Sequence, residues 1–337
     1  MNKFGIATVA VMALTGAVSA DFRTDAVEGA IDCTHLLRRM GSFSKSQLNA
    51  MRGVSQKASS LYGVNWDTDS NGASYSVGNL VTAVGTATTA GTPGQGGWNS
   101  FVTNAAGTVA TNYKINAGRP TGSAAGSGTK AFQMSSSSTA SGGRYAYQDL
   151  SAQWAARNAG DNIFWGEYQS YFSASQTSVS RNGNIAFDTT GSKILSGMYT
   201  ASGASTSSTV ARGTVYGFAN YNNAGSVGNF IFNLSAGGGP VANAGGWTNY
   251  AYNFNKTSGR VEWFLSTDGG ANYTGFYVDG AAAGSDVLET DFYSSVGTGN
   301  ASAGNMIFGA AEFYATPAPG AAALVGLAGL MARRRRA

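Results

Sequence analysis

Short runs of β-forming residues, separated by turns rich in glycine, serine, asparagine and threonine, fill the chain from Gly63 to Phe313. Successive runs mostly begin about 10 to 20 residues apart, and no helical pattern longer than two turns separates them. Strands without intervening helices are typical of antiparallel sheets rather than of βαβ units. The clearest runs span 130–134, 144–148, 163–172, 184–188, 193–200, 214–220, 228–234, 247–254, 259–266, 272–278 and 305–314.

About eleven strands in about 250 residues predict one all-β domain, a large antiparallel β-sandwich of the jelly-roll type over residues 63–315. Glycine accounts for 48 residues, whereas only 11% of residues are charged, as expected for many tight turns. Aromatic residues make up 12% of the chain, which argues against disorder. Pro93, Pro120 and Pro240 all lie in glycine-rich turns, where a sheet tolerates proline.

The layout from Trp98 to Tyr314 resembles the concanavalin-A-like lectin and glucanase jelly rolls. Three segments carry the resemblance: an early Gly-Gly-Trp strand at 96–98, the segment Gln148–Trp154, and a late strand at 260–264. The resemblance implies a jelly-roll sandwich of the kind that presents a sugar-binding face.

Residues 21–62 differ from the rest, and their periodicity predicts a short helical segment before the sandwich. Apolar or small residues recur every three or four positions from Val27 to Leu37, and Gly41 follows as a helix C-cap signal. A second helix is predicted over 44–62, where Leu48 and Met51 begin a similar stripe.

The first 20 residues have the organisation of a secretory signal peptide. Lys3 precedes an apolar run from Phe4 to Val18, and Val18-Ser19-Ala20 forms a small-x-small cleavage site. We expect cleavage after Ala20 and export of the chain through the inner membrane.

The last 22 residues contain a Pro-x-Pro motif, an apolar stretch and a terminal arginine cluster, in that order. This order resembles the PEP-CTERM sorting signal of exported bacterial proteins, although Ala318 replaces the central glutamate of that family. The resemblance implies processing by an exosortase-type enzyme, transient membrane contact through a C-terminal hydrophobic helix, and delivery to the cell surface or an exopolysaccharide matrix. An ordinary tail anchor is the alternative. The implied sorting residues of 316–337 are Pro317, Pro319, Arg333, Arg334, Arg335 and Arg336.

The basic charge of the chain belongs to these two ends. The sequence has 21 basic and 17 acidic residues, a formal net charge of +4. Without Lys3 and the four terminal arginines, 16 basic residues face 17 acidic ones, a net charge of −1. A body that is nearly neutral argues against nucleic acid as a partner. One cysteine and one histidine exclude a disulfide framework and multi-histidine metal sites.

Catalysis on such a sandwich requires two carboxylates that flank the substrate, roughly 5 to 10 Å apart. Glu167 and Glu262 are the candidates, because each lies in an aromatic-rich strand. Strand alternation places Glu167 on the same face as Trp165, but Glu262 opposite Trp263. The E-x-D-x-x-E pattern of the retaining glucanases was not found in the sequence, so a non-enzymatic protein is the favoured interpretation.

Binding candidates are weaker. Trp98, Trp165 and Tyr171 are aromatic residues with which a sugar ring would stack if they are exposed. Residues 266–273 resemble an Asp-box hairpin, in which the Asp268 carboxylate accepts turn N–H groups. No cofactor is expected. Calcium is the alternative, with Asp268, Asp279 and Asp286 as ligands, and Glu289 and Asp291 in the same predicted acidic loop.

Together these features predict an exported, non-enzymatic protein of the cell surface or extracellular matrix. It is expected to be carbohydrate-binding and adhesive, or structural. A secreted polysaccharide hydrolase or lyase and a surface-layer assembly subunit remain as alternatives.

Overall fold

A computed structural model of the chain describes residues 31–51, 59–86, 89, 91–103, 110–121, 128–136, 143–176, 180–202, 210–296 and 304–317. The signal peptide with Ala20, the sorting residues Pro319 and Arg333 to Arg336, and the expected C-terminal helix lie outside these ranges. Within the part that is described, no helix is both long enough and apolar enough to cross a membrane.

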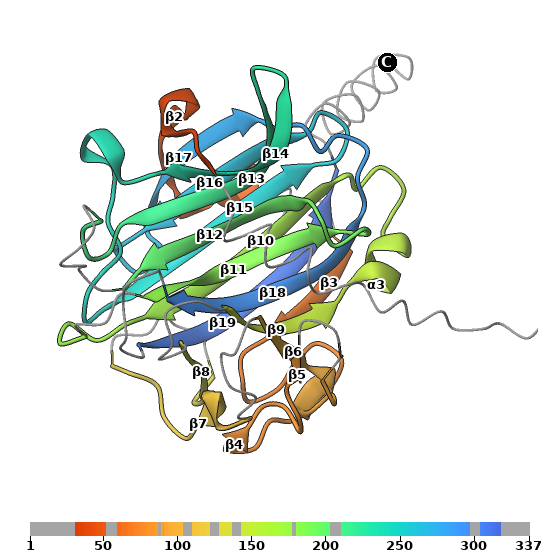
Figure 1. The fold of residues 1–337 in the computed structure, drawn as a ribbon, viewed down its shortest axis with the longest axis vertical. Coiled ribbons are helices and arrows are strands. Elements are labelled where there is room, and N and C mark those ends of the chain that lie inside the picture. The colour runs from red at the N-terminus through yellow and green to blue at the C-terminus, as the bar shows by residue number, and fades with distance from the viewer. Residues whose placement is uncertain are drawn as a thin grey trace, which may run out of the picture.

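The fold is all-β and consists of two sheets (Figure 1). A nine-stranded sheet has the order β1-β14-β13-β12-β11-β18-β9-β6-β5, and a ten-stranded sheet has the order β2-β17-β16-β15-β10-β19-β8-β7-β4, with β3 also paired to β19. Pairing is antiparallel except between β1 and β14 and between β5 and β6. The strands are β1 (Ile31–Asp32), β2 (Arg38–Ser44), β3 (Ser59–Val64), β4 (Gly78–Asn79), β5 (Gly85–Thr86), β6 (Asn99–Val102), β7 (Tyr113–Asn116), β8 (Ala131–Ser135), β9 (Gly143–Asp149), β10 (Ile163–Tyr171), β11 (Ser180–Asp188), β12 (Ile194–Ala201), β13 (Val215–Asn223), β14 (Ser226–Asn233), β15 (Trp247–Asn255), β16 (Arg260–Ser266), β17 (Asn272–Asp279), β18 (Val287–Val296) and β19 (Asn305–Thr316).

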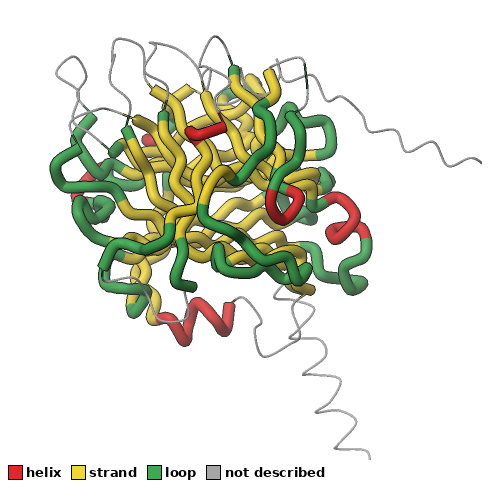
Figure 2. The backbone as a smooth tube through the Cα atoms, turned by 90° about the horizontal axis from the view of Figure 1, so that it is seen from below, coloured by secondary structure: helices red, strands yellow, loops and turns green. Residues whose placement is uncertain are grey.

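Helical structure is short and peripheral (Figure 2). The helices are η1 (Thr34–Leu36), α2 (Lys45–Met51), η2 (Gln95–Gly97), η3 (Ala110–Asn112), α3 (Ser151–Ala155) and η4 (Ala236–Gly238). All eleven strands expected from the sequence are present, and the predicted two-sheet sandwich is confirmed at this level.

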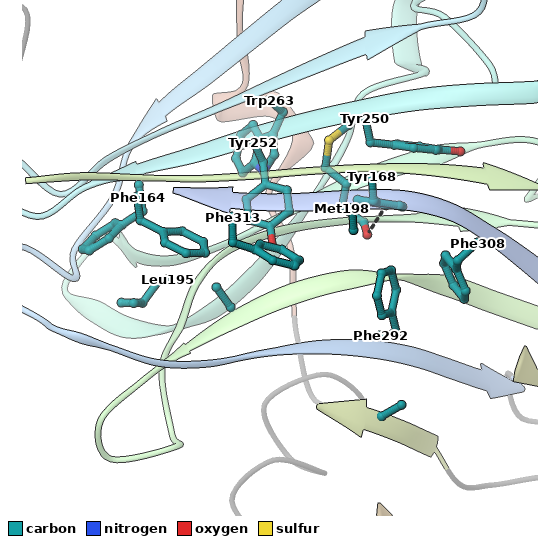
Figure 3. Packing of buried hydrophobic residues seen from close by; sticks show 14 of the residues in the cluster. Phe164, Tyr168, Leu195, Met198, Tyr250, Tyr252, Trp263, Phe292, Phe308 and Phe313 are labelled. Carbon is teal, nitrogen blue, oxygen red and sulfur yellow. Dashed lines mark hydrogen bonds between the residues drawn. The ribbon is translucent and has the colours of Figure 1, made fainter. Parts of the chain in front are cut away.

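The core lies between the inner faces of the two sheets (Figure 3). Alternation along each strand sends every second side chain inward, so that Tyr168 and Tyr252 of the ten-stranded sheet meet Met198 and Phe292 of the other. The Tyr168 hydroxyl donates to the Met198 carbonyl at 2.9 Å, and the Tyr252 hydroxyl donates to Asn184. The hydroxyls of these two buried tyrosines are therefore satisfied across the layer, which links the sheets as well as filling the space between them.

One inward position of the nine-stranded sheet is a glycine because an indole ring covers it. A Cβ atom at Gly217 would lie 2.5 Å from the ring of Trp263, which is fully buried. The indole ring of one sheet therefore fills the space that a side chain at Gly217 of the other sheet would occupy, as close packing of a core requires.

The predicted helices of residues 21–62 are largely wrong where the structure describes this segment. Residues 38–44 form β2, which pairs with β17, and 59–64 form β3, which pairs with β19. Gly41 has a positive φ of 114°, but it lies beside a β-bulge in β2 rather than at a helix end. The helical periodicity loses to pairing because β14 and β17 would be edge strands without the N-terminal segment, which covers them through β1 and β2 respectively.

About two turns of the second predicted helix are correct, in α2. Ser44 and Gln47 form a capping box at the start of α2, in which the Ser44 N–H donates to the Gln47 side chain at 2.8 Å and the Gln47 N–H donates to Ser44 Oγ at 3.3 Å. Leu48 is fully buried and packs on the outer face of the ten-stranded sheet, in a cluster with Trp165 and Phe264. Helix α2 therefore covers one part of that outer face.

Candidate functional site

The two predicted catalytic glutamates lie on the same outer face of the ten-stranded sheet. Glu167 is in β10 and Glu262 is in β16, with β15 between them. The two residues lie two strands apart and are offset by two residues along the strands. Standard sheet spacings therefore place their Cα atoms about 12 Å apart. Ala251 and Asn253 of β15 occupy the space between. The sheet therefore presents the two residues to one side without placing them next to each other.

Each glutamate also has partners of its own. Glu262 accepts from Arg260 Nε and from Asn253 Nδ2, both at 2.8 Å. Glu167 accepts a hydrogen bond from the Tyr314 hydroxyl. The nearer carboxylate to Glu167 is Glu312 of β19, which lies directly opposite it across the strands and which the sequence reasoning did not identify. The geometry therefore does not favour Glu167 and Glu262 as the general acid and the nucleophile of one catalytic site.

Two of the three predicted sugar-binding aromatics are core residues, which corrects that expectation. Trp98 is 0% exposed, and its indole N–H donates to the hydroxyls of Tyr62 and Tyr75, both at 3.1 Å. Trp165 is 1% exposed beneath α2, and its indole N–H donates to Thr316 at 3.1 Å. Both rings are large and mostly apolar, and each is buried against its neighbours rather than presented to a ligand.

The third predicted aromatic, Tyr171, is partly exposed and leads to a cluster that we call the Trp247 patch. Tyr171 lies opposite Trp247 of β15, with ring centroids 5.7 Å apart. The guanidinium of Arg119 lies over the Trp247 ring, 4.6 Å from its centroid. The patch is defined as Arg119, Gln169, Tyr171, Trp247 and Asn249.

Hydrogen bonds hold the patch together at the outer face. Arg119 Nη2 donates to Gln169 Oε1 at 2.9 Å, and the Trp247 indole N–H donates to the Pro120 carbonyl at 3.1 Å. Gln169 lies opposite Asn249 across the β10–β15 pair, so the two amides are neighbours. The side chain of Asn249 is nine-tenths buried, and no described residue accepts from its Nδ2. The patch therefore exposes the Tyr171 ring beside the partly exposed side chains of Gln169 and Arg119, whereas Trp247 and Asn249 are buried, 5% and 7% exposed.

A bulge in β19 makes room for the patch. Pairing of β10 with β19 shifts register between Tyr168 and Ser170, opposite Gly309. A Cβ atom at Gly309 would overlap Nη2 of Arg119 and lie 2.7 Å from Gln169 Oε1. A glycine at the bulge is therefore required for the arginine to lie on the sheet.

The nine-stranded sheet carries a different aromatic cluster, which we call the aromatic ladder. Its rings come from neighbouring strands in one row across the sheet, and it includes Phe101, Tyr145, Tyr293, Tyr199 and Tyr216. The outermost pairs stack at 4.4 Å (Phe101 with Tyr145) and at 4.7 Å (Tyr199 with Tyr216). Every ring is at most 7% exposed, so the ladder is a packed layer.

The segment with Glu289 and Asp291 was expected to be an acidic loop, and this expectation is wrong. The structure places both residues in β18, between β11 and β9 in the nine-stranded sheet. Their side chains share the outer face with the aromatic ladder, next to Tyr293, and are 2% and 0% exposed. Strand alternation explains the error. Thr290 and Phe292 point into the core as strand residues do, but the acidic residues at the alternate positions make the segment look like a polar loop in the sequence.

The predicted calcium ligands do not converge. Asp268 closes the 266–273 hairpin by accepting from the Ala271 and Asn272 N–H groups, both at 3.0 Å, which confirms the structural interpretation of this motif. These hydrogen bonds lower the pKa of Asp268 to about 2. Asp286 forms an ion pair with Lys256, and Asp279 lies 4.0 Å from Arg260. Among the described residues, no group of three or more His, Cys, Asp and Glu side chains is placed to hold a metal ion.

Of the sorting residues, only Pro317 lies within the described part, where it is partly exposed directly after β19 ends at Thr316. The last core strand and the predicted sorting signal are therefore contiguous in the sequence.

Comparison with known proteins does not assign the chain to a family. No family model and no curated protein matches the sequence. Among solved structures, the CBM2 module of Lactobacillus casei BL23 phage J-1 evolved Dit is 9% identical, with 51% of this chain and 68% of that chain covered at a TM-score of 0.34. The cellulose-induced protein Cip1 is 10% identical, with coverages of 60% and 84% and a TM-score of 0.35. The alginate lyase from Klebsiella pneumoniae is 8% identical, with coverages of 53% and 79% and a TM-score of 0.35. Similarities of this size support no conclusion about function.

Proposed function

We propose that this protein is an exported, non-enzymatic component of the cell surface or extracellular matrix that binds polysaccharide through the outer face of its ten-stranded sheet. In this proposal the body is a jelly roll of the concanavalin-A-like type. The two ends act as export and sorting signals, with an exosortase-type enzyme as processing partner and transient contact with the membrane.

The observation that carries the proposal is the Trp247 patch. A sugar ring has apolar C–H faces and a rim of hydroxyl groups, so it matches an aromatic side chain flanked by hydrogen-bonding amides. Tyr171, Gln169 and Arg119 are each partly exposed, whereas the rings of the aromatic ladder are buried. The Gln169 side chain, partly exposed two residues before Tyr171, provides hydrogen-bonding groups for a ligand hydroxyl beside that ring.

Binding of the full-length protein to immobilised polysaccharides tests the proposal. Tyr171→Ala should weaken retention, because it removes the most accessible ring of the patch. Tyr277→Ala is the matched control, since Tyr277 lies on the same outer face, in β17, outside the patch. Equal loss in both variants, or no retention of the wild-type protein on any matrix polysaccharide, would leave only the structural role.

Intact-mass spectrometry of material from the cell envelope tests the sorting part separately. We expect a chain that begins at Asp21 and lacks Arg333 to Arg336. Recovery of a chain that still ends at Ala337 would show that the C-terminal signal is not processed.

A further inference from the structure

Arg119 is held in a defined orientation by parts of the fold that are far apart in the sequence. It follows β7, stacks on Trp247 of β15, donates to Gln169 of β10 and lies over Gly309 of β19. A long cation that is oriented by a ring, an amide and a glycine is pre-organised, because little rotamer freedom remains to be lost on binding.

Among the described residues, no carboxylate forms an ion pair with Arg119. The carboxylate whose field reaches it is Asp67, but Asp67 is 3.3 Å from Lys130 Nζ and also accepts from the Thr129 hydroxyl at 2.9 Å. The opposite charge nearest to Arg119 is therefore already shared with another cation.

Two of its nitrogens also lack acceptors. Nε and Nη1 of Arg119 are covered, and within the described ranges no atom accepts a hydrogen bond from them. Dehydration of the guanidinium lowers its pKa to about 10, with the field of Asp67 acting in the opposite sense. A partly dehydrated cation without a counter-charge is unfavourable, and such groups normally have a hydrogen-bonded anion beside them.

Arg260 shows the contrast on the same outer face. Its guanidinium also lies over an aromatic ring, 3.7 Å from the Tyr277 centroid. Unlike Arg119, it forms an ion pair with Glu262, Nε to Oε1 at 2.8 Å. Of these two arginine–aromatic contacts between described residues of the outer face, the one in the Trp247 patch lacks a carboxylate partner within the described ranges.

We propose that the missing counter-charge comes from the ligand, and that the Trp247 patch binds acidic polysaccharide, with a uronic-acid carboxylate accepting hydrogen bonds from Arg119. This inference rests on the proposed function and specifies its ligand class. The planar carboxylate matches the guanidinium geometry, while the sugar ring that carries it lies toward Tyr171 and Gln169. Nε and Nη1 are covered, so a carboxylate would reach them only if residues 117–121 moved aside.

Two polymers that differ only in charge test the inference. Polygalacturonate carries one carboxylate per sugar, and its fully methyl-esterified form has the same backbone without the charge. We expect the full-length protein to bind polygalacturonate at least about tenfold more tightly by isothermal titration calorimetry, since a charge-assisted hydrogen bond is lost with the ester. The preference should diminish as salt concentration rises.

Arginine variants localise the effect. Arg119→Gln should lower the affinity for polygalacturonate about 10- to 100-fold and thereby remove most of the preference for polygalacturonate over the ester. Arg260→Gln, the matched control, should change neither, because its charge is already paired with Glu262.

The possible outcomes separate the two proposals. Equal binding of both polymers by the wild-type protein refutes the acidic-ligand inference but leaves polysaccharide binding intact. Binding of neither polymer, nor of any neutral polysaccharide, refutes both. Equal losses in the two arginine variants would show that general surface charge, rather than Arg119, attracts the polymer. The comparison of the two polymers needs no variant, so it decides the question even if Arg119→Gln fails to fold.

Discussion

Replacement of Gly183 by alanine tests how the nine-stranded sheet is packed. Gly183 of β11 lies between Tyr293 of β18 and Tyr199 of β12 in the row of the aromatic ladder. A Cβ atom there would lie 2.7 Å from the Tyr199 Cα and 2.8 Å from its Cβ, and would overlap the carbonyl oxygen of Met198. These are mostly backbone atoms of a hydrogen-bonded neighbour, so no side-chain rotation relieves the contact.

The expected change in the free energy of unfolding for Gly183→Ala is the sum of two opposing effects. Overpacking of this kind typically destabilises by about 1–3 kcal/mol, and backbone contacts place this site toward the upper end. Alanine in place of glycine also stabilises by about 0.4–1 kcal/mol through the unfolded chain. Gly228→Ala isolates the clash, because Gly228 is a strand glycine of the same sheet whose added Cβ would meet only Phe230 at 3.6 Å. The entropic gain is common to both variants and cancels in their difference.

Thermal unfolding followed by near-ultraviolet circular dichroism is a suitable assay, because tyrosine signals report on the ladder itself. For a domain of this size, a difference of about 1–3 kcal/mol corresponds to a midpoint about 3–10 °C lower for Gly183→Ala than for Gly228→Ala. Midpoints that agree within about 1 °C would refute the close approach of β11 to Tyr199.

Three further substitutions have defined outcomes. Leu48→Ala should destabilise by about 2–5 kcal/mol in urea unfolding, because the side chain is fully buried under α2 against the sheet. Ser44→Ala should cost about 0.5–2 kcal/mol in the same assay, since it removes the acceptor of the capping box. For Asp268, the folded pKa of about 2 lies below the ordinary value of 3.8, so its ionised form stabilises the fold above about pH 4 and this contribution is lost as the pH falls toward 2. The stability advantage of the wild-type protein over Asp268→Asn, measured as a urea midpoint, should therefore shrink over that interval; a constant difference would contradict it.

Local alternation was sufficient to find most of the sandwich. In β10, Trp165 and Glu167 were expected on one face and Tyr168 on the other, and the structure has this arrangement. A strand with one face in the core and one face outside has a period of two in its own sequence, so no knowledge of the rest of the fold is needed.

The missed elements are those whose environment is set by distant parts of the chain. In β18, Glu289 and Asp291 resemble loop residues by type, but both lie in a strand with neighbours on each side. In β2, helical periodicity was overridden by pairing with β17, which lies more than 200 residues away in the sequence. Intrinsic preference is a weak guide in such places, because the pairing partner decides the conformation.

The candidate site could be predicted only in part for the same reason. Tyr171 was identified because it is an aromatic residue in a recognisable strand. Arg119 was not, since it follows a four-residue strand in a glycine–proline turn, and nothing in that turn indicates that Trp247 lies beside it.

The outer face of the ten-stranded sheet has a covered part and an uncovered part, and this division explains the position of the Trp247 patch. Its outer face is apolar around Trp165 and Phe264, and α2 covers that part with Leu48 and Met51. Farther along the same strands, the residues become amides and partly exposed rings, and β19 bulges at Gly309. A bulge interrupts regular pairing and re-aims neighbouring side chains, so the end of the sheet that α2 leaves uncovered is also the end where a loop arginine can lie flat on a tryptophan. Filling the bulge with Gly309→Ala should therefore displace Arg119 and reduce polysaccharide binding without altering the cluster under α2, whereas unchanged binding would show that the bulge does not position the patch.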